Sequence, residues 1–215
     1  MTRALSGLYA ITPDALLRDP PRLLAAVAAA VRGGARLIQY RDKFHTGDAR
    51  LALARALRQT CHAGGARLIV NDDAQLAHAA GADGVHLGAG DGSLAAARAQ
   101  LGVQALIGAT CGNSLDRARA AIAEGADYVA FGRLFASNTK PDAPPAELAT
   151  LRAARRELAT PVCAIGGITP DNAPQVIAAG ADLIAAVDGV FGAADIEAAA
   201  RAYARLWPGS ATHIP

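Results

Sequence analysis

The most regular hydrophobic pattern along this chain is a Gly-Ala pair followed by a short apolar run. It occurs five times, with the pairs beginning at Gly34, Gly65, Gly81, Gly125 and Gly180. Each pair follows an alanine-rich stretch such as "LLAAVAAAVRGG". Alanine favours helix, and glycine is the expected end of a helix because it adopts the left-handed conformation without strain. The pattern therefore predicts helices that end at these glycines, each followed by a strand.

The apolar runs after the pairs are rich in Val, Ile and Leu and do not alternate strictly with polar positions. Such runs are typical of strands that are buried on both faces, as in a parallel sheet covered by helices. Three more runs, "GLYAITP", "LIGATCG" and "PVCAIGGIT", have the same character. The predicted strands cover residues 8–12, 37–40, 68–71, 84–87, 106–109, 128–131, 162–165 and 183–187.

Helical stretches separate most of these strands. Eight strand–helix units in about 200 residues predict an α/β fold, a single-domain (β/α)8 TIM barrel, over residues 1–207, with residues 208–215 as a C-terminal tail. The alternative is an open doubly wound sheet. That fold usually has fewer strands and a glycine-rich fingerprint after the first one, where this chain has "ITPD".

Composition narrows the class of protein further. Apolar residues make up 52% of the chain, which is ample for one core. The 21 basic and 19 acidic residues are interspersed, so no basic run points to nucleic acid as a partner. Three widely separated cysteines form no disulfide framework. Neither a signal peptide nor an apolar run long enough for a membrane helix is present, so a cytoplasmic protein is expected.

Polar groups after the second predicted strand form the first candidate site. In a parallel barrel the catalytic groups lie at the C-terminal ends of the strands. The second strand ends in "QYRDK", where Gln39, Arg41 and Lys43 alternate and therefore point to the same side of an extended segment. One amide and two cations on one side suit a phosphate or a diphosphate.

Carboxylates follow the next two strands. Asp72 comes after the third strand and Asp91 a few residues past the fourth, so both can converge on a hard cation such as Mg²⁺. Asp73 has the position of a helix cap before "AQLAHAAG". His86, inside the fourth strand, is expected to be a hydrogen-bonded core histidine, because it lacks the neighbours of a zinc site.

Two later segments complete the predicted mouth of the barrel. The long loop "FGRLFASNTKPDAPPAE" carries Ser137, Thr139 and Lys140, a second set suited to an anion. Gly166 and Gly167 allow backbone N–H groups to approach a phosphate. No Ser-His-Asp or Cys-His order indicates covalent catalysis, and neither lysine of the chain lies inside a strand. Two anionic ligands and a magnesium ion favour group transfer from a diphosphate.

Taken in order, these segments resemble the thiamine-phosphate synthase family over nearly the whole chain. "QYRDK", "VNDD", "GADGVHLG…D", "FGRLF…S-x-TK" and "AIGGI" occur with the order and spacing of that family. The resemblance implies a transferase of thiamine biosynthesis with Mg²⁺ as cofactor. Its small-molecule substrates would be a hydroxymethylpyrimidine diphosphate and a thiazole phosphate, joined with release of pyrophosphate. No membrane or nucleic-acid partner is implied, and a homo-oligomer remains open.

The resemblance also implies roles for individual residues. It implies catalytic roles for Arg41, Lys43 and Lys140, and magnesium ligation by Asp72 and Asp91. It implies substrate contacts from Gln39, Arg41, Lys43, Asn71, Thr110, Ser137, Thr139, Lys140, Gly167, Val187 and Asp188. Three positions depart from the pattern: Ala89 stands where glutamine is commoner, Thr110 replaces serine, and Asp188 replaces a serine beside the expected phosphate.

Three alternative functions stay open on the sequence alone. A thiazole tautomerase-like relative would be expected to lack the diphosphate cluster and the metal carboxylates. A phosphate-binding barrel isomerase would need a pair of groups placed for proton transfer. A non-catalytic barrel that binds phosphate ligands could have the same polar mouth.

Overall fold

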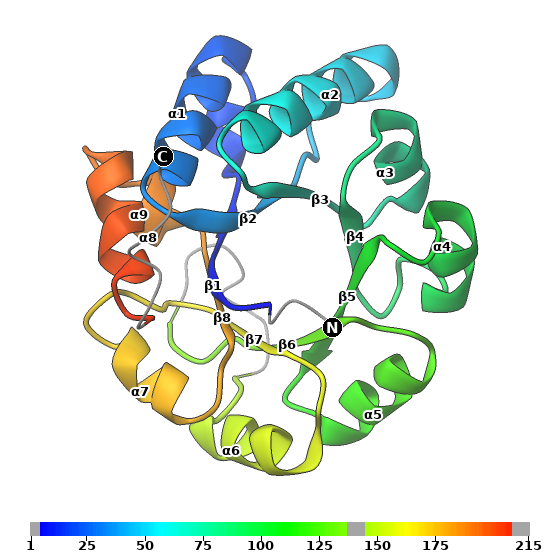
Figure 1. Ribbon diagram of the computed structural model, residues 1–215, viewed down its shortest axis with the longest axis vertical. Helices are drawn as coiled ribbons and strands as arrows, with labels where there is room; N and C mark the ends of the chain where they lie inside the picture. The colour runs from blue at the N-terminus through cyan, green and yellow to red at the C-terminus, as the bar shows by residue number, and fades with distance from the viewer. Residues whose placement is uncertain (1–4, 137–144, 208–215) are drawn as a thin grey trace.

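Residues 5–136 and 145–207 are described in a computed structural model, so the predicted site residues Ser137, Thr139 and Lys140 lie outside it. Eight parallel strands close into a barrel in chain order, with helices around it (Figure 1). The strands are β1 (Gly7–Ile11), β2 (Ala35–Tyr40), β3 (Arg67–Asn71), β4 (Gly84–Leu87), β5 (Leu106–Gly112), β6 (Tyr128–Phe131), β7 (Val162–Ile165) and β8 (Leu183–Ala186). The predicted (β/α)8 barrel is confirmed, whereas the predicted tail after residue 207 lies outside the described residues.

The helices alternate with the strands as the Gly-Ala pattern predicts. They are the 3-10 helix η1 (Asp14–Leu16), α1 (Pro20–Arg32), α2 (Gly47–Ala63), α3 (Ala74–Ala80), α4 (Leu94–Leu101), α5 (Leu115–Ala123), α6 (Leu148–Glu157), α7 (Ala173–Ala178), α8 (Asp188–Phe191) and α9 (Ile196–Ala204). Helix α3 ends at Gly81 in the left-handed conformation, with φ of 65°.

Five strands differ from their predicted bounds: β1, β2 and β3 begin one or two residues earlier, β1 also ends one residue earlier, and β5 and β8 differ at their C-terminal ends. Strand β5 runs on past residue 109 to Gly112, and its pairing with β6 shifts register between Thr110 and Gly112. Strand β8 ends at Ala186, so the prediction that Val187 belongs to it is wrong. Val187 instead precedes α8 as its N-cap residue, and its ψ of −86° takes the chain out of the extended conformation.

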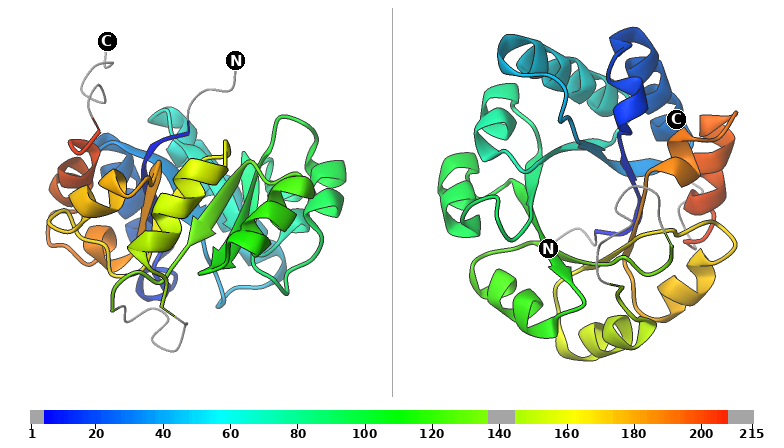
Figure 2. Two further views of the ribbon diagram at one scale, coloured as in Figure 1. Left: turned by 90° about the horizontal axis from the view of Figure 1, so that it is seen from below. Right: turned by 180° about the vertical axis from the view of Figure 1, so that it is seen from behind.

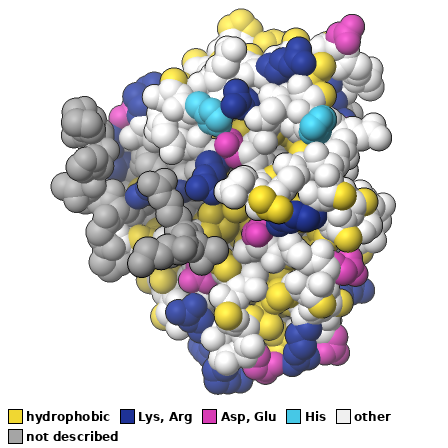
Figure 3. All heavy atoms as spheres, turned by 45° about the vertical axis from the view of Figure 1, so that its right-hand side comes forward, with side chains coloured by type: hydrophobic (Ala, Val, Ile, Leu, Met, Phe, Trp, Pro, Cys, Tyr) yellow, Lys and Arg dark blue, Asp and Glu magenta, His cyan; other side chains and the backbone are white. Residues whose placement is uncertain are grey.

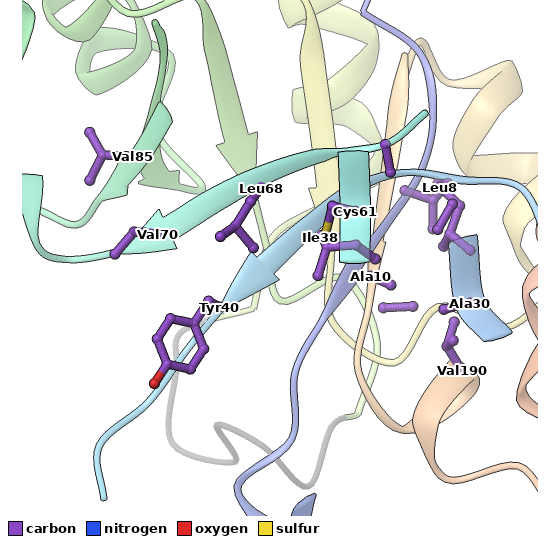
Figure 4. Close-up of a cluster of buried hydrophobic side chains, with 14 of the residues drawn as sticks. Leu8, Ala10, Ala30, Ile38, Tyr40, Cys61, Leu68, Val70, Val85 and Val190 are labelled. Atoms are coloured by element: carbon purple, nitrogen blue, oxygen red, sulfur yellow. The ribbon is translucent and has the colours of Figure 1, made fainter. Parts of the chain in front are cut away.

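Successive strand residues point to opposite sides of the barrel wall, which produces two separate apolar layers. Tyr9, Leu37 and Ile69 belong to the layer that fills the interior of the barrel. Leu8 and Ile38, next to them in sequence, pack outward against the helices, as Figure 4 shows. Each strand is therefore apolar on both faces, which is why its sequence does not alternate.

The repeated Gly-Ala-Asp triplets have a structural role at the opposite end of the barrel from the predicted site. Each aspartate precedes one strand, and its carboxylate accepts a hydrogen bond from a backbone N–H of the strand before it. These bonds join Asp83 to Leu68 at 2.7 Å, Asp127 to Ile107 at 2.7 Å and Asp182 to Val162 at 2.9 Å. The aspartates thus satisfy backbone donors at the strand starts and connect β3 to β4, β5 to β6 and β7 to β8.

Helix α9 packs beside α1, where the end of the chain meets its beginning (Figures 1 and 2). A Cβ atom on Gly33 would lie 2.5 Å from the carbonyl oxygen of Glu197, so only glycine permits this approach. Arg32 Nε also donates to Glu197 Oε2 at 2.8 Å. The contact holds the last helix against the ring.

Charged side chains of both signs are mixed over the face shown in Figure 3. Among the described residues, no helix is both long enough and apolar enough to cross a membrane. The side chains on the face shown in Figure 3 form no broad region of a single charge.

Candidate active site

A cavity of about 1000 Å³ opens where the strands end at their C-terminal sides. Every predicted site residue within the described chain lines it: Gln39, Arg41, Lys43, Asn71, Asp72, Asp91, Thr110, Gly167, Val187 and Asp188. Strand ends that are up to about 150 positions apart in sequence therefore meet around one space. The three loop residues between positions 137 and 140 lie outside the described residues, so their predicted contacts stay predictions.

The basic cluster after β2 has the alternation that its sequence predicts. Gln39 is 4% exposed and points into the barrel, and Arg41 and Lys43 line the cavity above it. Neighbouring groups fix Arg41 on both sides. Its backbone N–H donates to Thr12 Oγ1 at 3.0 Å, and its Nη1 lies 2.8 Å from Asp14 Oδ1. A guanidinium that is held in place before the substrate arrives is suited to a diphosphate.

Asp42, between the two cations, points the other way and organises the loop that carries them. Its carboxylate is fully buried and accepts hydrogen bonds from the Tyr40 hydroxyl and from the backbone N–H groups of Phe44 and His45. His45 Nδ1 is a further partner at 2.8 Å. Burial alone would raise the pKa of Asp42, but these hydrogen bonds lower it below its usual value. Asp42 therefore stays ionised and fixes the backbone on either side of Lys43.

We expect the stabilising effect of Asp42 to depend on pH. Its folded-state pKa is lowered, so it stabilises the fold above the unfolded-state pKa of about 4 and stops doing so as the pH falls through the folded-state pKa. Asp42→Asn should lower the free energy of unfolding by about 1.5–3 kcal/mol at pH 7, because hydrogen bonds to a charged group are lost. The difference from wild type should shrink below pH 4. Urea unfolding at both pH values measures it.

Asp48→Asn is the matched control, because Asp48 is exposed at the start of α2 and loses the same charge. This control should change stability by only a few tenths of a kcal/mol. A stability loss in Asp42→Asn that is equal at pH 7 and in acid would contradict an ionised Asp42.

The two predicted metal ligands face each other across the ends of β3 and β4. Asp72 has a φ of 64°, the one described non-glycine residue with positive φ, and its backbone N–H donates to the His86 carbonyl at 2.8 Å. Asp91 Oδ2 accepts from the Gly88 N–H at 2.8 Å. Burial raises the pKa of Asp72, and the carboxyl group of Asp91 raises it further, while the Asn71 side chain and Lys43 lower it.

Two carboxylates that repel each other at the rim of a cavity fit a divalent cation. The described residues contain no cluster of three or more His, Cys, Asp and Glu side chains that would hold a metal by themselves. Mg²⁺ commonly takes one or two carboxylates and completes its coordination with water and substrate phosphate oxygens. Asp72 and Asp91 therefore suit a magnesium ion that binds together with a diphosphate.

The glycine pair after β7 makes room for the loop that follows β6. A Cβ atom on Gly166 would overlap the side chain of Arg133, and one on Gly167 would overlap the backbone of Ala136. Leu134 N–H donates to the Ile165 carbonyl at 3.0 Å, and Phe135 N–H donates to the Gly166 carbonyl at 2.9 Å. The pair thus has a packing role as well as the predicted role in phosphate binding, which stays a prediction.

A chain of hydrogen bonds crosses the floor of the cavity. Gln39 Nε2 donates to the Tyr9 hydroxyl at 2.8 Å, which lies 3.0 Å from the Tyr128 hydroxyl. Tyr128 lies 3.0 Å from His86 Nδ1, and His86 Nε2 lies 2.9 Å from Thr110 Oγ1. The prediction that His86 is a hydrogen-bonded histidine is confirmed. The tyrosines were not predicted as site residues, because an aromatic residue inside an apolar strand has the same sequence signal as a core residue.

The row of hydrogen-bonded side chains across the cavity floor requires a glycine at position 108, in the middle of β5. A Cβ atom there would overlap the ring of Tyr128 and would lie 2.5 Å from His86 Nδ1. Glycine inside a strand often marks such a close approach. The "LIGAT" sequence of β5 is therefore explained by the polar groups that pack against it.

Sequence reasoning also missed cavity residues on the far wall. Asn113, Arg117 and Arg133 line the cavity opposite the basic cluster of β2. Their one sequence signal is that they follow the ends of β5 and β6. That signal does not single them out, because other strands are also followed by polar residues, and not all of those face the mouth of the barrel.

A closed (β/α)8 barrel with cations, a carboxylate pair and a glycine turn around one mouth has the features that suit a phosphate ligand. The pattern of the thiamine monophosphate synthase (TMP-TENI) family matches residues 8–190. The chain belongs to that family, as the resemblance predicted.

Individual relatives agree over nearly the full length. The chain is 55% identical to the thiamine-phosphate synthase of Methylococcus capsulatus, covering 94% of this chain and 89% of the relative. It is 53% identical to that of Nitrosococcus oceani, covering 97% and 95%. Among solved structures, the thiamine phosphate pyrophosphorylase of Pyrococcus furiosus superposes with a TM-score of 0.85 at 33% identity, covering 96% and 97%. A 3-hexulose-6-phosphate synthase, at a TM-score of 0.68 and 22% identity, shares the fold alone.

Proposed function

We propose that this chain is a thiamine-phosphate synthase. It condenses 4-amino-2-methyl-5-hydroxymethylpyrimidine diphosphate with a thiazole phosphate and produces thiamine phosphate and pyrophosphate. The family and the relatives that are 53–55% identical support this transferase activity. The observation that carries the proposal is the convergence of Arg41 and Lys43 with Asp72 and Asp91 on one cavity.

The arrangement suits a dissociative reaction. When the bond between the methylene carbon and the diphosphate oxygen breaks, the aminopyrimidine ring can delocalise the positive charge, and the leaving pyrophosphate gains negative charge. Arg41 faces that charge from a position fixed by Thr12 and Asp14, and Lys43 adds a second cation at the same cavity, so little reorganisation of the guanidinium is needed as the charge develops. Mg²⁺ bound by Asp72 and Asp91 would neutralise the remaining charge of the diphosphate.

The second half of the reaction needs the thiazole nitrogen close to the methylene carbon. A phosphate on the thiazole gives the protein an anchor away from the reacting atoms, and such positioning can replace much of the entropic barrier. We assign this anchor to the backbone N–H groups of Gly167, Val187 and Asp188, because the Asp188 carboxylate itself would repel a phosphate, together with the hydroxyl groups of the loop residues Ser137 and Thr139. We assign Lys140 to the pyrophosphate. Gly167, Val187 and Asp188 share the cavity with the β2 cluster, which supports this assignment.

No covalent intermediate with the protein is part of this proposal. Cys163 lines the cavity, but burial raises its pKa to about 12, so its thiol is a poor nucleophile near neutral pH. The reaction therefore depends on binding, orientation and charge.

The direct test is to incubate the purified protein with both substrates and Mg²⁺ and to follow thiamine phosphate and pyrophosphate by chromatography. We expect the two products in equal amounts, and none when either substrate is left out. Saturable binding of the thiazole phosphate without product would instead favour a tautomerase-like relative or a non-catalytic binding barrel. The predicted cytoplasmic location and a homo-oligomer stay predictions.

A further inference from the structure

The chain of hydrogen bonds across the cavity floor has a direction, and that direction determines the proton position on a histidine. Tyr9 is 1% exposed and Tyr128 is fully buried, and burial raises the pKa of both phenols far above the usual value. Each hydroxyl therefore keeps its single proton, which it can donate to one partner only.

The direction begins at Gln39. Its Nε2 donates to the Tyr9 hydroxyl, so the Tyr9 proton has to find another acceptor. Within the described part of the chain, the one other polar atom bonded to that hydroxyl is the Tyr128 oxygen at 3.0 Å. Tyr9 therefore donates to Tyr128. The opposite direction would leave a buried hydroxyl proton without an acceptor, at a cost of about 1–3 kcal/mol.

The same reasoning continues to the far end. Tyr128 accepts from Tyr9, so it donates its own proton to His86 Nδ1 at 3.0 Å. His86 is then neutral with its proton on Nε2, and that nitrogen donates to Thr110 Oγ1 at 2.9 Å. Thr110 accepts this bond, so its own hydroxyl proton is available for an acceptor in the cavity that Thr110 lines.

We propose that His86 is a positioning residue, held as the Nε2–H tautomer by the chain Gln39–Tyr9–Tyr128–His86, which makes Thr110 a fixed hydrogen-bond donor to the substrate. The consequence for substrate recognition rests on the proposed function, and we assign Thr110, a substrate contact that the family resemblance implies, to the pyrimidine. The group that Thr110 recognises is then an acceptor, such as a ring nitrogen. Gln39 and Thr110, at opposite sides of the floor, act as one unit.

Ring packing supports the arrangement of Tyr9, Tyr128 and His86 independently of their hydrogen bonds. The His86 and Tyr128 rings stack with centroids 5.5 Å apart and an angle of 26°, and the Tyr9 and Tyr128 rings meet edge to face at 5.9 Å. Gly108 leaves room for both His86 and Tyr128. The rings are therefore held in the orientation that the hydrogen bonds need.

The test is nitrogen NMR of the ligand-free protein labelled with ¹⁵N-histidine. The chain has five histidines, and the variant His86→Gln identifies the signal of His86. We expect the wild-type signal to show a protonated Nε2 and an unprotonated Nδ1 at neutral pH. In Tyr128→Phe the donor to Nδ1 is gone, so the preference for this tautomer should be lost. A wild-type His86 that is protonated on Nδ1, or a signal unchanged in Tyr128→Phe, would overturn the proposal.

Tyr203→Phe is the matched control. Tyr203 is equally buried, but its hydroxyl donates to the Ile168 carbonyl at 2.8 Å, outside the barrel. This variant loses the same atom and should leave the His86 signal unchanged. If Tyr128→Phe does not fold, the wild-type tautomer still decides the direction of the chain, because the reverse direction predicts Nδ1–H.

Kinetics separates positioning from simple structural support. Tyr128→Phe and Thr110→Val should each raise KM for the pyrimidine diphosphate about 10-fold, the effect of one lost hydrogen bond, with kcat nearly unchanged. The KM for the thiazole phosphate should not move, and Thr110→Ser, which keeps the hydroxyl, should restore most of the affinity that Thr110→Val loses. An unchanged KM for the pyrimidine diphosphate in Thr110→Val would overturn the role of Thr110. If the wild type forms no thiamine phosphate, the proposed function fails, whereas the tautomer result stands on its own.

Discussion

Replacement of Arg41 by alanine is expected to lower kcat at least ~100-fold while the protein stays folded. Arg41 lines the cavity with a side chain that is 15% exposed, and Thr12 and Asp14 hold it in place before the substrate binds. Loss of one preorganised group that stabilises charge in a transition state commonly costs a factor of about 100–1000. The fold should persist, because the bond from Thr12 reaches the backbone of residue 41 and not its side chain.

Steady-state kinetics of pyrophosphate release measures this effect, and thermal unfolding checks the fold. Arg41→Lys should fall between wild type and alanine, because lysine keeps the charge and loses the planar pair of donors. Arg22→Ala, an exposed position at the start of α1, is the matched control and should have wild-type rates. Pyrophosphate release by Arg41→Ala at the wild-type rate would reject the role given to this guanidinium.

Removal of the carboxylate of Asp72 is the second change with a large expected effect. Asp72→Asn should lower kcat at least ~100-fold at ordinary magnesium concentrations, because the cation that balances the leaving group is bound more weakly. Asparagine is the informative replacement, since it tolerates the positive φ of this residue, and alanine would add backbone strain. Asp72→Ala should therefore lose at least as much activity, and additional stability.

The measurement is activity as a function of Mg²⁺ concentration. Asp72→Asn and Asp91→Asn should each need more Mg²⁺ for half-maximal activity, and excess chelator should abolish activity in the wild type. Asp48→Asn serves as the control for the loss of one negative charge at an exposed position. Full activity after chelation would remove the metal from the proposed reaction.

The fold could be predicted from the sequence because its signals are local and repeated. Most helix ends are marked by glycine, with α6 and α9 as exceptions, and each strand is marked by an apolar run, so eight units could be counted without any long-range information. The prediction was wrong at the end of β8, where the residue type does not reveal the boundary. Val187 has the composition of a strand residue, but it turns to begin α8.

The site could be predicted where polar residues alternate along an extended segment. It could not be predicted where the role of a residue depends on a partner that is distant in sequence. Gln39, Arg41 and Lys43 follow from the period of an extended strand. The contact between Tyr9 and Tyr128 joins positions 119 residues apart, and the sequence has no signal that would connect them. Asp42 was overlooked because its importance comes from the partners that its buried carboxylate gains on folding.

The seating of the β6 loop on the glycine turn after β7 has a consequence for engineering. Leu134 and Phe135 are hydrogen-bonded to Ile165 and Gly166, and the space above the two glycines is filled by that loop. If either the loop after β6 or the glycine turn after β7 were replaced by the segment of a homologue, the two surfaces would no longer fit together. Chimeras meant to accept a different thiazole should therefore transplant both segments as a single module.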